Sequence, residues 1–446
     1  MSYIMLNKSI RCIIFVIIFG LAGCSHIGAY RTDIIDTCEY KTEGDCSQAA
    51  LQQYAKGQEQ EYRLDFVEFD DQGQVNDRAQ MQAVLNQYQT IAGKEDIILI
   101  AFIHGWHHSA KPEDGNIQSF RGLLRSLAKT EHQTGKNRKI LGIYIGWRGD
   151  SFNVEYLNDV TFWDRKNTAH KVGQQGITEL LLRLEEIVNV KAGIDESIPK
   201  PINNKLVTIG HSFGGAALYT SLQQILVDRF IDSRKGKTFS SSVVNGFGDL
   251  VLLMNPAFEA LRYATLYDIS QEYCRGYSPY QLPKLAVLTS ETDYATKLAF
   301  PGGRFFATFF ETHTTLARHK CKGTGLSNII PIEIDEGEAD RNTVGHFEPF
   351  ITHQLVPSAT TDSYAGRFSF KDLQKSWFGL KQNQSFDFKG TRLIHVTDNT
   401  VAHNPFMNIK VDTALIKNHN DIWQDEIVSF VRDLIMIATH ENLQGK

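Results

Sequence analysis

The stretch from Gly210 to Gly214, GHSFG, places a serine between glycines where the residue pattern changes. Residues 206–209 form a short apolar run, typical of a strand buried on both faces. From residue 216 the apolar side chains recur at spacings of three and four, which predicts a helix lying on a sheet. The glycines leave room for a sharp turn, so the hydroxyl of Ser212 would project beside a helix N-terminus. The motif predicts a nucleophile; the alternative is a small residue in an ordinary turn.

A nucleophilic serine needs a base and an acid, which we expect at the ends of later strands. After the apolar run KLAVLTS the acidic candidates are Glu291 and Asp293, and Asp293 is preferred because Glu291 lies nearer the strand. Three late histidines could supply the base. His395 falls inside a predicted strand, His403 is an alternative, and His419 is preferred because it stands where a loop ends and the final helix begins. The acid would hold the imidazole in one tautomer and stabilise its charged form.

An acyl-transfer site also needs backbone amides aimed at the carbonyl oxygen. The amide of Phe213, directly after the serine, is one candidate, and that of Trp106, in the HGW loop after the apolar run DIILIAFI, is the other. A rival interpretation makes His104, His107 and His108 metal ligands, but the segment lacks an H-E-x-x-H pattern and an acidic companion. The sequence therefore predicts an oxyanion hole, with neither a metal nor a cofactor.

These segments together resemble the α/β-hydrolase superfamily, and specifically bacterial lipoprotein-type serine hydrolases of undefined substrate. The resemblance covers residues 61–446. It implies that Ser212 attacks an ester carbonyl, that His419 takes and returns the proton, and that Asp293 orients it. The same triad serves amidases, peptidases, thioesterases and acyltransferases, so it does not choose the substrate. A binding protein whose hydrolase fold is catalytically silent is the alternative of a different class.

Strand-like runs alternate with helical ones along the chain, which predicts an α/β fold with a doubly wound, mostly parallel sheet. The last strand is expected at TRLIHVTDN, before a final helix over residues 422–437. An insertion at about 301–390 precedes that strand and carries RFFATFF, with four phenylalanines in seven positions. Because an exposed apolar patch of that size is a liability, the cluster is expected to be buried, either as core or as an acyl-binding groove.

The amino terminus has the pattern of an export signal. Lys8 and Arg11 precede the apolar run CIIFVIIFGLA, which is short for a membrane span, and Leu-Ala-Gly-Cys24 follows. This resembles the lipobox of bacterial lipoproteins, which implies removal of residues 1–23, acylation of Cys24 and attachment to the bilayer of the cell envelope. Ser25 resembles outer-membrane sorting. The alternative is a plain signal peptide or an uncleaved anchor. Residues 24–60 are expected to form a tether with a short helix.

Composition agrees with an exported globular protein. The chain has 446 residues with 42% hydrophobic content, enough for a substantial core. Loss of the two basic residues of the signal moves the net charge from −5 to −7, so nothing indicates nucleic-acid binding. The cysteines that remain besides the lipid site are even in number, and proximity favours the disulfides Cys38–Cys46 and Cys274–Cys321, with buried reduced thiols as the alternative.

Overall fold

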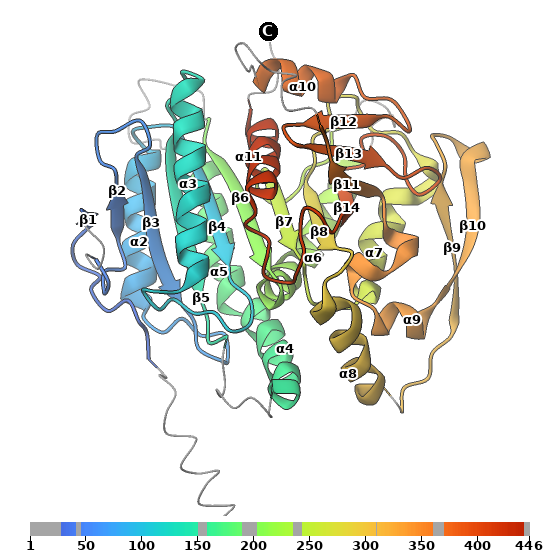
Figure 1. Ribbon diagram of the computed structural model, residues 1–446, viewed down its shortest axis with the longest axis horizontal. Helices are drawn as coiled ribbons and strands as arrows, with labels where there is room; N and C mark the ends of the chain where they lie inside the picture. The colour runs from blue at the N-terminus through green and yellow to red at the C-terminus, as the bar shows by residue number, and fades with distance from the viewer. Residues whose placement is uncertain are drawn as a thin grey trace, which may run out of the picture.

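The computed structural model describes residues 28–41, 46–149, 158–189, 203–234, 243–308, 310–359 and 370–440. The predicted signal peptide and Cys24 lie outside these ranges. The chain forms an α/β fold around one 12-stranded, mostly parallel sheet flanked by helices, which is compatible with a doubly wound arrangement (Figure 1). Across the sheet the strands are β1 (Cys38–Tyr40), β2 (Gln52–Tyr54), β3 (Tyr62–Glu68), β5 (Lys139–Gly146), β4 (Ile97–Ile103), β6 (Lys205–His211), β7 (Leu250–Met254), β8 (Leu285–Ser290), β14 (Phe406–Val411), β11 (His353–Pro357), β13 (Thr391–His395) and β12 (Ser385–Phe388).

Helices cover both faces of the sheet, and this explains why the central strands are apolar runs rather than alternating ones. Every residue of β3, β4, β7 and β8 is buried. One face carries α2 (Arg78–Ala92), α4 (Asn158–Gln174), α5 (Gly176–Asn189), α6 (Phe213–Arg234) and α7 (Ala260–Gln271). The other face carries α3 (Gly115–Gln133), α10 (Phe370–Phe378) and α11 (Asp425–Thr439). Among the described helices, none has the length and apolar character needed to cross a bilayer.

In sheet order from β3 through β5, β4, β6, β7 and β8 to β14, adjacent strands run parallel to one another, so their carboxyl ends meet at one edge of the sheet. This edge lies at the bottom of Figure 1, where β6 turns into α6 and where the loop from β14 leads into α11. Side chains from segments far apart in the sequence can meet there.

The amino-terminal region differs from the tether that the sequence predicted. Within residues 24–60, β1 and β2 join the edge of the main sheet, and β2 pairs antiparallel with β3. The amide of Gln52 donates to the buried carboxylate of Asp65 at 2.8 Å, which fixes β2 to the sheet. The predicted disulfide Cys38–Cys46 is confirmed and closes the loop after β1. Strands of three residues are too short to show a periodicity, so the sequence pattern missed them.

The predicted last strand is also corrected. Residues 391–395 do form a strand, β13, but it runs antiparallel between β11 and β12 at the far edge of the sheet. The last parallel strand is β14, which pairs with β8 from Phe406 opposite Leu285 to Val411 opposite Ser290. Asn408 interrupts the apolar run of β14, and its side-chain amide donates to the carbonyl of Val344 at 2.8 Å. The hydrophobicity pattern missed this strand because it contains a buried polar residue whose partner lies far away in the sequence.

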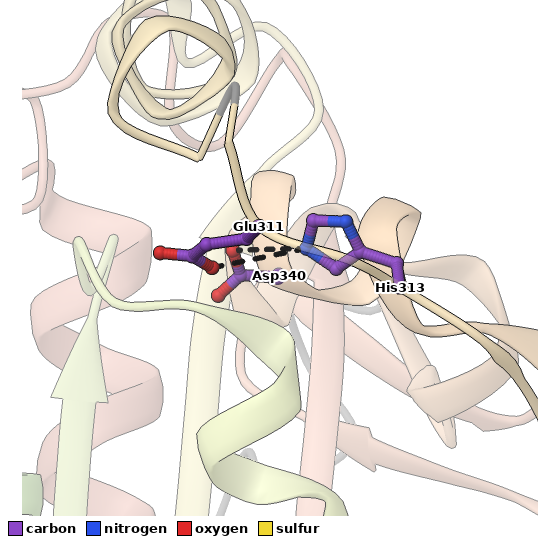
Figure 2. Close-up of side chains that lie close together, drawn as sticks. All are labelled: Glu311, His313 and Asp340. Carbon is purple, nitrogen blue, oxygen red and sulfur yellow. Dashed lines mark ion pairs between the residues drawn. The ribbon is translucent and has the colours of Figure 1, made fainter.

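The insertion between Asp293 and β14 is therefore longer than predicted and is built from separate pieces. It begins with a π-helical turn, η2 (Ala295–Ala299), which continues into α8 (Phe300–Ala307). Beyond α8, Nε2 of His313 lies 3.9 Å from a carboxylate oxygen of Glu311 and 3.9 Å from one of Asp340 in α9 (Glu336–Arg341), as Figure 2 shows. Arg304 of α8 also pairs with Asp340, so ionic contacts join α8 to α9.

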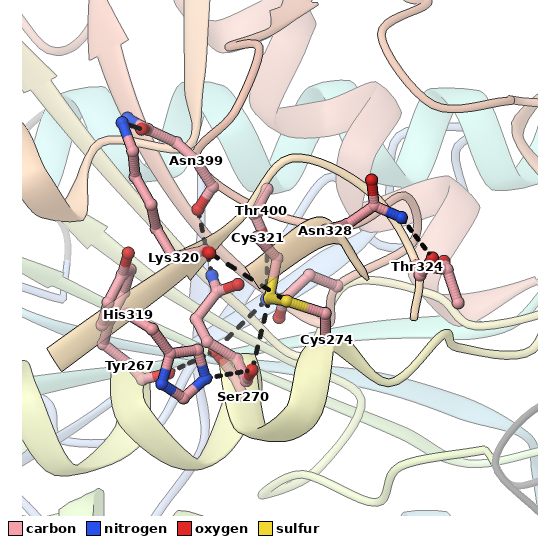
Figure 3. The surroundings of a disulfide bond; sticks show 12 residues. Tyr267, Ser270, Cys274, His319, Lys320, Cys321, Thr324, Asn328, Asn399 and Thr400 are labelled. Atoms are coloured by element: carbon pink, nitrogen blue, oxygen red, sulfur yellow. Dashed lines mark hydrogen bonds between the residues drawn. A yellow bond between two sulfur atoms is a disulfide. The ribbon is translucent and has the colours of Figure 1, made fainter. Parts of the chain in front are cut away.

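A second disulfide holds the insertion to the rest of the fold. Between α8 and α9 the chain forms an antiparallel hairpin of β9 (Thr315–Cys321) and β10 (Ile329–Asp335). The predicted bridge Cys274–Cys321 is confirmed, and it joins the end of β9 to the turn after α7 (Figure 3). His319 adds a ring hydrogen bond of 2.9 Å to the carbonyl of Gln271. The hairpin is thus fixed along the end of α7.

The expectation that RFFATFF is buried is wrong for the side chains that the structure describes. Phe305 and Phe310 are exposed, while the side chains of Phe306 and Phe309 lie outside the described part. The segment attaches to the fold through Phe300, which is fully buried, and through the charged side chain of Arg304. These contacts leave the outer side of α8 facing solvent.

Candidate active site

The turn between β6 and α6 has the tight geometry that the glycines predicted. Ser212 lies between the last residue of β6 and the first of α6, with a positive φ of 55°. A Cβ atom on Gly214 would lie 2.4 Å from the carbonyl oxygen of His104, and one on Gly210 would lie 2.7 Å from that of Gly214. Both contacts are shorter than real Cβ atoms tolerate, so glycine is required at both positions. The strained serine is held in place by close backbone packing.

Three predicted side chains meet at this turn. The Oγ of Ser212 lies 2.7 Å from Nε2 of His419, and Nδ1 of the same ring lies 2.7 Å from Oδ2 of Asp293. Ser212 follows β6, Asp293 follows β8 and His419 lies in the loop between β14 and α11. The structure therefore brings together, in one hydrogen-bonded chain, residues that are up to 207 positions apart in the sequence.

Asp293 is fully buried and its carboxylate accepts hydrogen bonds on both oxygens. Oδ1 accepts from the backbone amides of Ala295 at 3.0 Å and Thr296 at 3.3 Å, while Oδ2 faces His419. Burial by itself raises the pKa of Asp293, but the charge of His419 and the hydrogen bonds from His419 and Thr296 outweigh it and hold the pKa below its ordinary value. The group stays ionised at neutral pH and can stabilise an imidazolium.

The backbone carbonyl of His419 is held by two buried side chains. Nε2 of His211 donates to it at 3.0 Å, and Nδ2 of Asn255 donates at 2.9 Å. The Oδ1 of Asn255 in turn accepts from the amide of Ser290 at 2.9 Å. Burial, followed by the proximity of His419, lowers the pKa of His211 to about 3, so this ring stays neutral. The loop that carries the base is thus fastened to the ends of β6, β7 and β8.

Sequence reasoning did not find this pair. His211 lies inside the GHSFG motif and Asn255 follows β7 directly, so each stood at the end of a predicted strand. A polar residue at the end of a strand could have indicated a role at the site. The group that His211 and Asn255 both bind, however, is the backbone carbonyl of His419. Any residue type can supply a carbonyl, so no sequence pattern marks it.

The HGW loop lies against the serine. A Cβ on Gly105 would lie 2.8 Å from the Cβ of Ser212, so the loop backbone touches the turn directly. His104 is buried and makes two backbone contacts: Nε2 accepts from the amide of Trp147 at 3.1 Å, and Nδ1 donates to the carbonyl of Gly105 at 2.9 Å. Burial lowers the pKa of His104 to about 4, so it remains neutral and serves to fix the loop.

The proposed oxyanion donors flank the serine. Phe213 is the first residue of α6, and amides in the first turn of a helix have no acceptor within the helix. Its ring lies 6.4 Å from that of Trp106, which follows Gly105 in the HGW loop. Phe213 follows Ser212 directly, and Trp106 follows Gly105, whose backbone touches the serine, so both residues lie beside Ser212. Their role as oxyanion donors stays a prediction.

The other histidines near this loop do not converge on one point. The ring of His107 stacks on Trp106 with centroids 3.9 Å apart, and Nδ1 of His108 lies 3.0 Å from Oδ1 of Asp114 at the start of α3. The two nitrogens of His104 are engaged with backbone groups. The arrangement does not support the rival interpretation of a metal site here.

The alternative members of the triad lie elsewhere. His403 bonds through Nε2 to the carbonyl of Leu380 at 2.8 Å, and His395 is buried in β13 with its ring 5.2 Å from that of His353. The ring of His419 pairs with Asp293 and not with Glu291, whose backbone amide donates to the end of β14. The preferred residues are the ones that the fold brings together.

One group in the described ranges has the side-chain types and spacing of a metal site, and it lies in the insertion. The ligand atoms of Glu311, His313 and Asp340 all lie within 4.8 Å of one another (Figure 2). The carboxylate of Asp340, however, accepts from Nη2 of Arg304 on both oxygens, at 2.6 and 2.5 Å. A cation bound here would face this guanidinium, and Glu311 is exposed. The group is better described as a salt-bridge network at the end of α8.

Comparison of the chain with protein-family models, curated proteins and solved structures finds no match.

Proposed function

We propose that this protein is a serine hydrolase of the α/β-hydrolase type that cleaves carboxylic esters through an acyl-enzyme intermediate. One observation carries the proposal: the two 2.7 Å hydrogen bonds that link Ser212, His419 and Asp293 in order. A nucleophile, a base and a buried carboxylate in this arrangement are the parts that nucleophilic acyl transfer requires.

In the proposed mechanism the proton moves along this chain in both halves of the reaction. Oγ of Ser212 bonds to the ester carbonyl carbon while Nε2 of His419 takes its proton, and the amides of Phe213 and Trp106 stabilise the oxyanion. Collapse of the tetrahedral adduct breaks the ester C–O bond, and the alkoxide leaves with the proton from His419. Water then attacks the acyl-enzyme, gives a proton to His419, and the carboxylic acid departs as Ser212 regains its hydrogen.

The electrostatics of the neighbouring residues suit this role. The ring of His211 lies 5.1 Å from that of His419, and a second positive charge there would oppose formation of the imidazolium. Because its pKa is about 3, His211 is neutral over the working range of a hydrolase. Asp293, ionised and buried, faces the only ring in this group that has to become charged.

We further infer that the mature protein is anchored to a lipid bilayer through acylated Cys24, at the bacterial outer membrane. The support is the order of basic residues, apolar run and Leu-Ala-Gly-Cys24 at the amino terminus. The two disulfides agree with folding in an oxidising compartment. The substrate is an ester or another acyl compound, and no cofactor or nucleic acid takes part.

Two other functions use the same fold. An amidase, peptidase or acyltransferase would employ the same triad on a different acyl donor or acceptor. A silent binding protein would keep the fold without the reaction. An active-site-directed fluorophosphonate probe separates the silent fold from all of the enzymes, because only an activated serine is labelled.

The decisive experiment compares two serine variants on short and medium p-nitrophenyl esters. Ser212→Ala is expected to lower kcat/KM by about 10³-fold or more and to abolish fluorophosphonate labelling, while the protein stays folded. Ser221→Ala is the matched control, because this buried hydroxyl of α6 binds only the backbone carbonyls of Gly173 and Ala217. Residual activity of Ser212→Ala above roughly a tenth of wild type refutes the assignment.

A further inference from the structure

Four large apolar side chains are exposed on the segment that follows Asp293. Tyr294 is 70% exposed, Leu298 57%, Phe305 51% and Phe310 95%. They lie within 17 residues of a chain whose other large exposed apolar side chains are scattered through the described part. We call these four residues the apolar ridge. An exposed apolar surface of this kind marks a contact with a protein, a ligand or a membrane.

The ridge does not result from a segment that fails to pack. On the opposite side of the same segment Thr296 and Phe300 are fully buried. Arg304 reaches Glu259 at 3.4 Å and pairs with Asp340. The segment is thus fixed on its inner side by core and ionic contacts and is also apolar on its outer side. Packing against the core therefore does not explain why the solvent-facing side of the segment is also apolar.

One basic side chain is exposed beside the ridge. Residues 294–310 contain no acidic residue, and of their two basic side chains Arg304 is paired with Glu259 and Asp340 on the inner side of the segment. Lys297 is exposed beside the ridge, and its ammonium group donates to the carbonyl of Glu291 at 3.0 Å. Exposed apolar side chains with a basic side chain beside them suit a surface that contacts anionic phospholipids.

The position of the ridge places it at the same edge of the fold as the site. Figure 1 shows α8 projecting below the carboxyl ends of the parallel strands, the edge at which Ser212 and His419 meet. The first described residues lie at this edge too, because the amide of Tyr30 donates to the carboxylate of Glu68 at the end of β3. The six residue steps from Cys24 to Tyr30 can span at most about 20 Å. An acyl chain on Cys24 would therefore hold this edge close to the bilayer.

We propose that the apolar ridge inserts into the surface of the lipid bilayer, so that the site around Ser212 faces the membrane and takes esters of membrane lipids as substrates. The membrane contact follows from the ridge, from the exposed Lys297 beside it and from the position of the anchor. The substrate class rests on the proposed function. A second copy of this chain is the competing occupant of the ridge, and the test distinguishes it.

The experiment uses the mature chain from residue 24 with Cys24→Ser, exported behind a signal peptide that is not acylated, so that only the ridge can hold it to a membrane. Vesicles of phosphatidylethanolamine and phosphatidylglycerol are mixed with the protein and floated on a density gradient. We expect the protein to float with the vesicles. Leu298→Glu and Phe305→Glu are each expected to lower the ratio of bound to free protein by roughly tenfold or more.

The control is Ile231→Glu, which changes a 50% exposed side chain near the end of α6, away from the carboxyl edge, and is expected to leave vesicle binding unchanged. All three variants should hydrolyse soluble p-nitrophenyl acetate at the wild-type rate, which shows that they are folded. Hydrolysis of phosphatidylglycerol in the vesicles should fall only in Leu298→Glu and Phe305→Glu.

The outcomes separate the two proposals. No flotation, or equal flotation of all variants, overturns the membrane contact even where esterase activity is intact. A dimer in solution that Leu298→Glu or Phe305→Glu converts to a monomer also overturns it and assigns the ridge to a second copy. Flotation that depends on the ridge, without esterase activity or fluorophosphonate labelling, supports the membrane contact and refutes the hydrolase.

Discussion

The substitution Asp293→Asn is a sharp test of the site, because both oxygens of this carboxylate already have hydrogen-bond partners. Oδ1 accepts from the amides of Ala295 and Thr296, and Oδ2 faces Nδ1 of His419. An asparagine offers one oxygen and one NH₂ group. Since the backbone amides can only donate, the oxygen stays with them and the NH₂ group turns to the histidine. Nδ1 must then be the unprotonated nitrogen, and Nε2 carries the hydrogen toward Ser212. In this tautomer His419 cannot act as a base.

The size of the effect follows from the two amide contacts. The productive tautomer requires the flipped amide, which sets an NH₂ group against the amides of Ala295 and Thr296. A buried polar group without a partner costs about 1–3 kcal/mol, so the flip costs about 2–6 kcal/mol. The active population falls correspondingly, and we expect Asp293→Asn to lose between about 30-fold and about 10⁴-fold in kcat/KM. Asp293→Ala imposes no tautomer, so the isosteric asparagine should be at least as harmful as alanine.

The assay measures kcat/KM on p-nitrophenyl acetate together with the nitrogen chemical shifts of His419, which identify the protonated ring nitrogen. Asp268→Asn is the matched control, because this carboxylate pairs with Arg318 on the insertion, and we expect it to keep wild-type activity. An Asp293→Asn variant that keeps more than a third of the wild-type rate contradicts the reasoning. So does a spectrum in which Nδ1 of His419 remains protonated.

Three further results are expected. Glu259 has a folded-state pKa of about 2, below its ordinary value of 4.5, because the nearby cations outweigh the effect of burial. The ionised carboxylate therefore contributes about 3 kcal/mol to the free energy of unfolding. This contribution is complete above pH 4.5 and is lost as the pH falls toward 2. Denaturant titrations should show Glu259→Gln destabilised by a similar amount at pH 7 and with a weaker loss of stability in acid, and an unchanged acid profile would contradict this. Replacing Cys274 and Cys321 by Ser should cost about 4 kcal/mol of unfolding free energy, because the bridge closes a 47-residue separation; a loss no larger than that for the other disulfide, which spans 8 residues, would argue against the loop-entropy account. In esterase assays His419→Ala should lose far more activity than His403→Ala, and the reverse ranking would assign the role of base to His403.

Local sequence was sufficient for those parts of the protein in which neighbouring residues carry the constraint. The turn at Ser212 is one case, because a buried strand, three glycines and a helix succeed one another within a few residues, and each pattern is read from side-chain size and period. The disulfide pairing is another, because short separations favour Cys38 with Cys46. Asp293 and His419 were also accessible, since the order of strands along the chain fixed which loops could follow Ser212.

Tertiary structure decided what depends on partners far along the chain. β14 became the last parallel strand because Phe406 pairs with Leu285, across the whole insertion, and its buried Asn408 was satisfied by a distant carbonyl. His211 and Asn255 acquired their role only when the fold set the carbonyl of His419 between them. The apolar ridge is likewise exposed because the opposite side of η2 and α8 is the one that packs against the core. Hydrophobicity and period show that a side chain can be buried, but long-range packing determines whether it is.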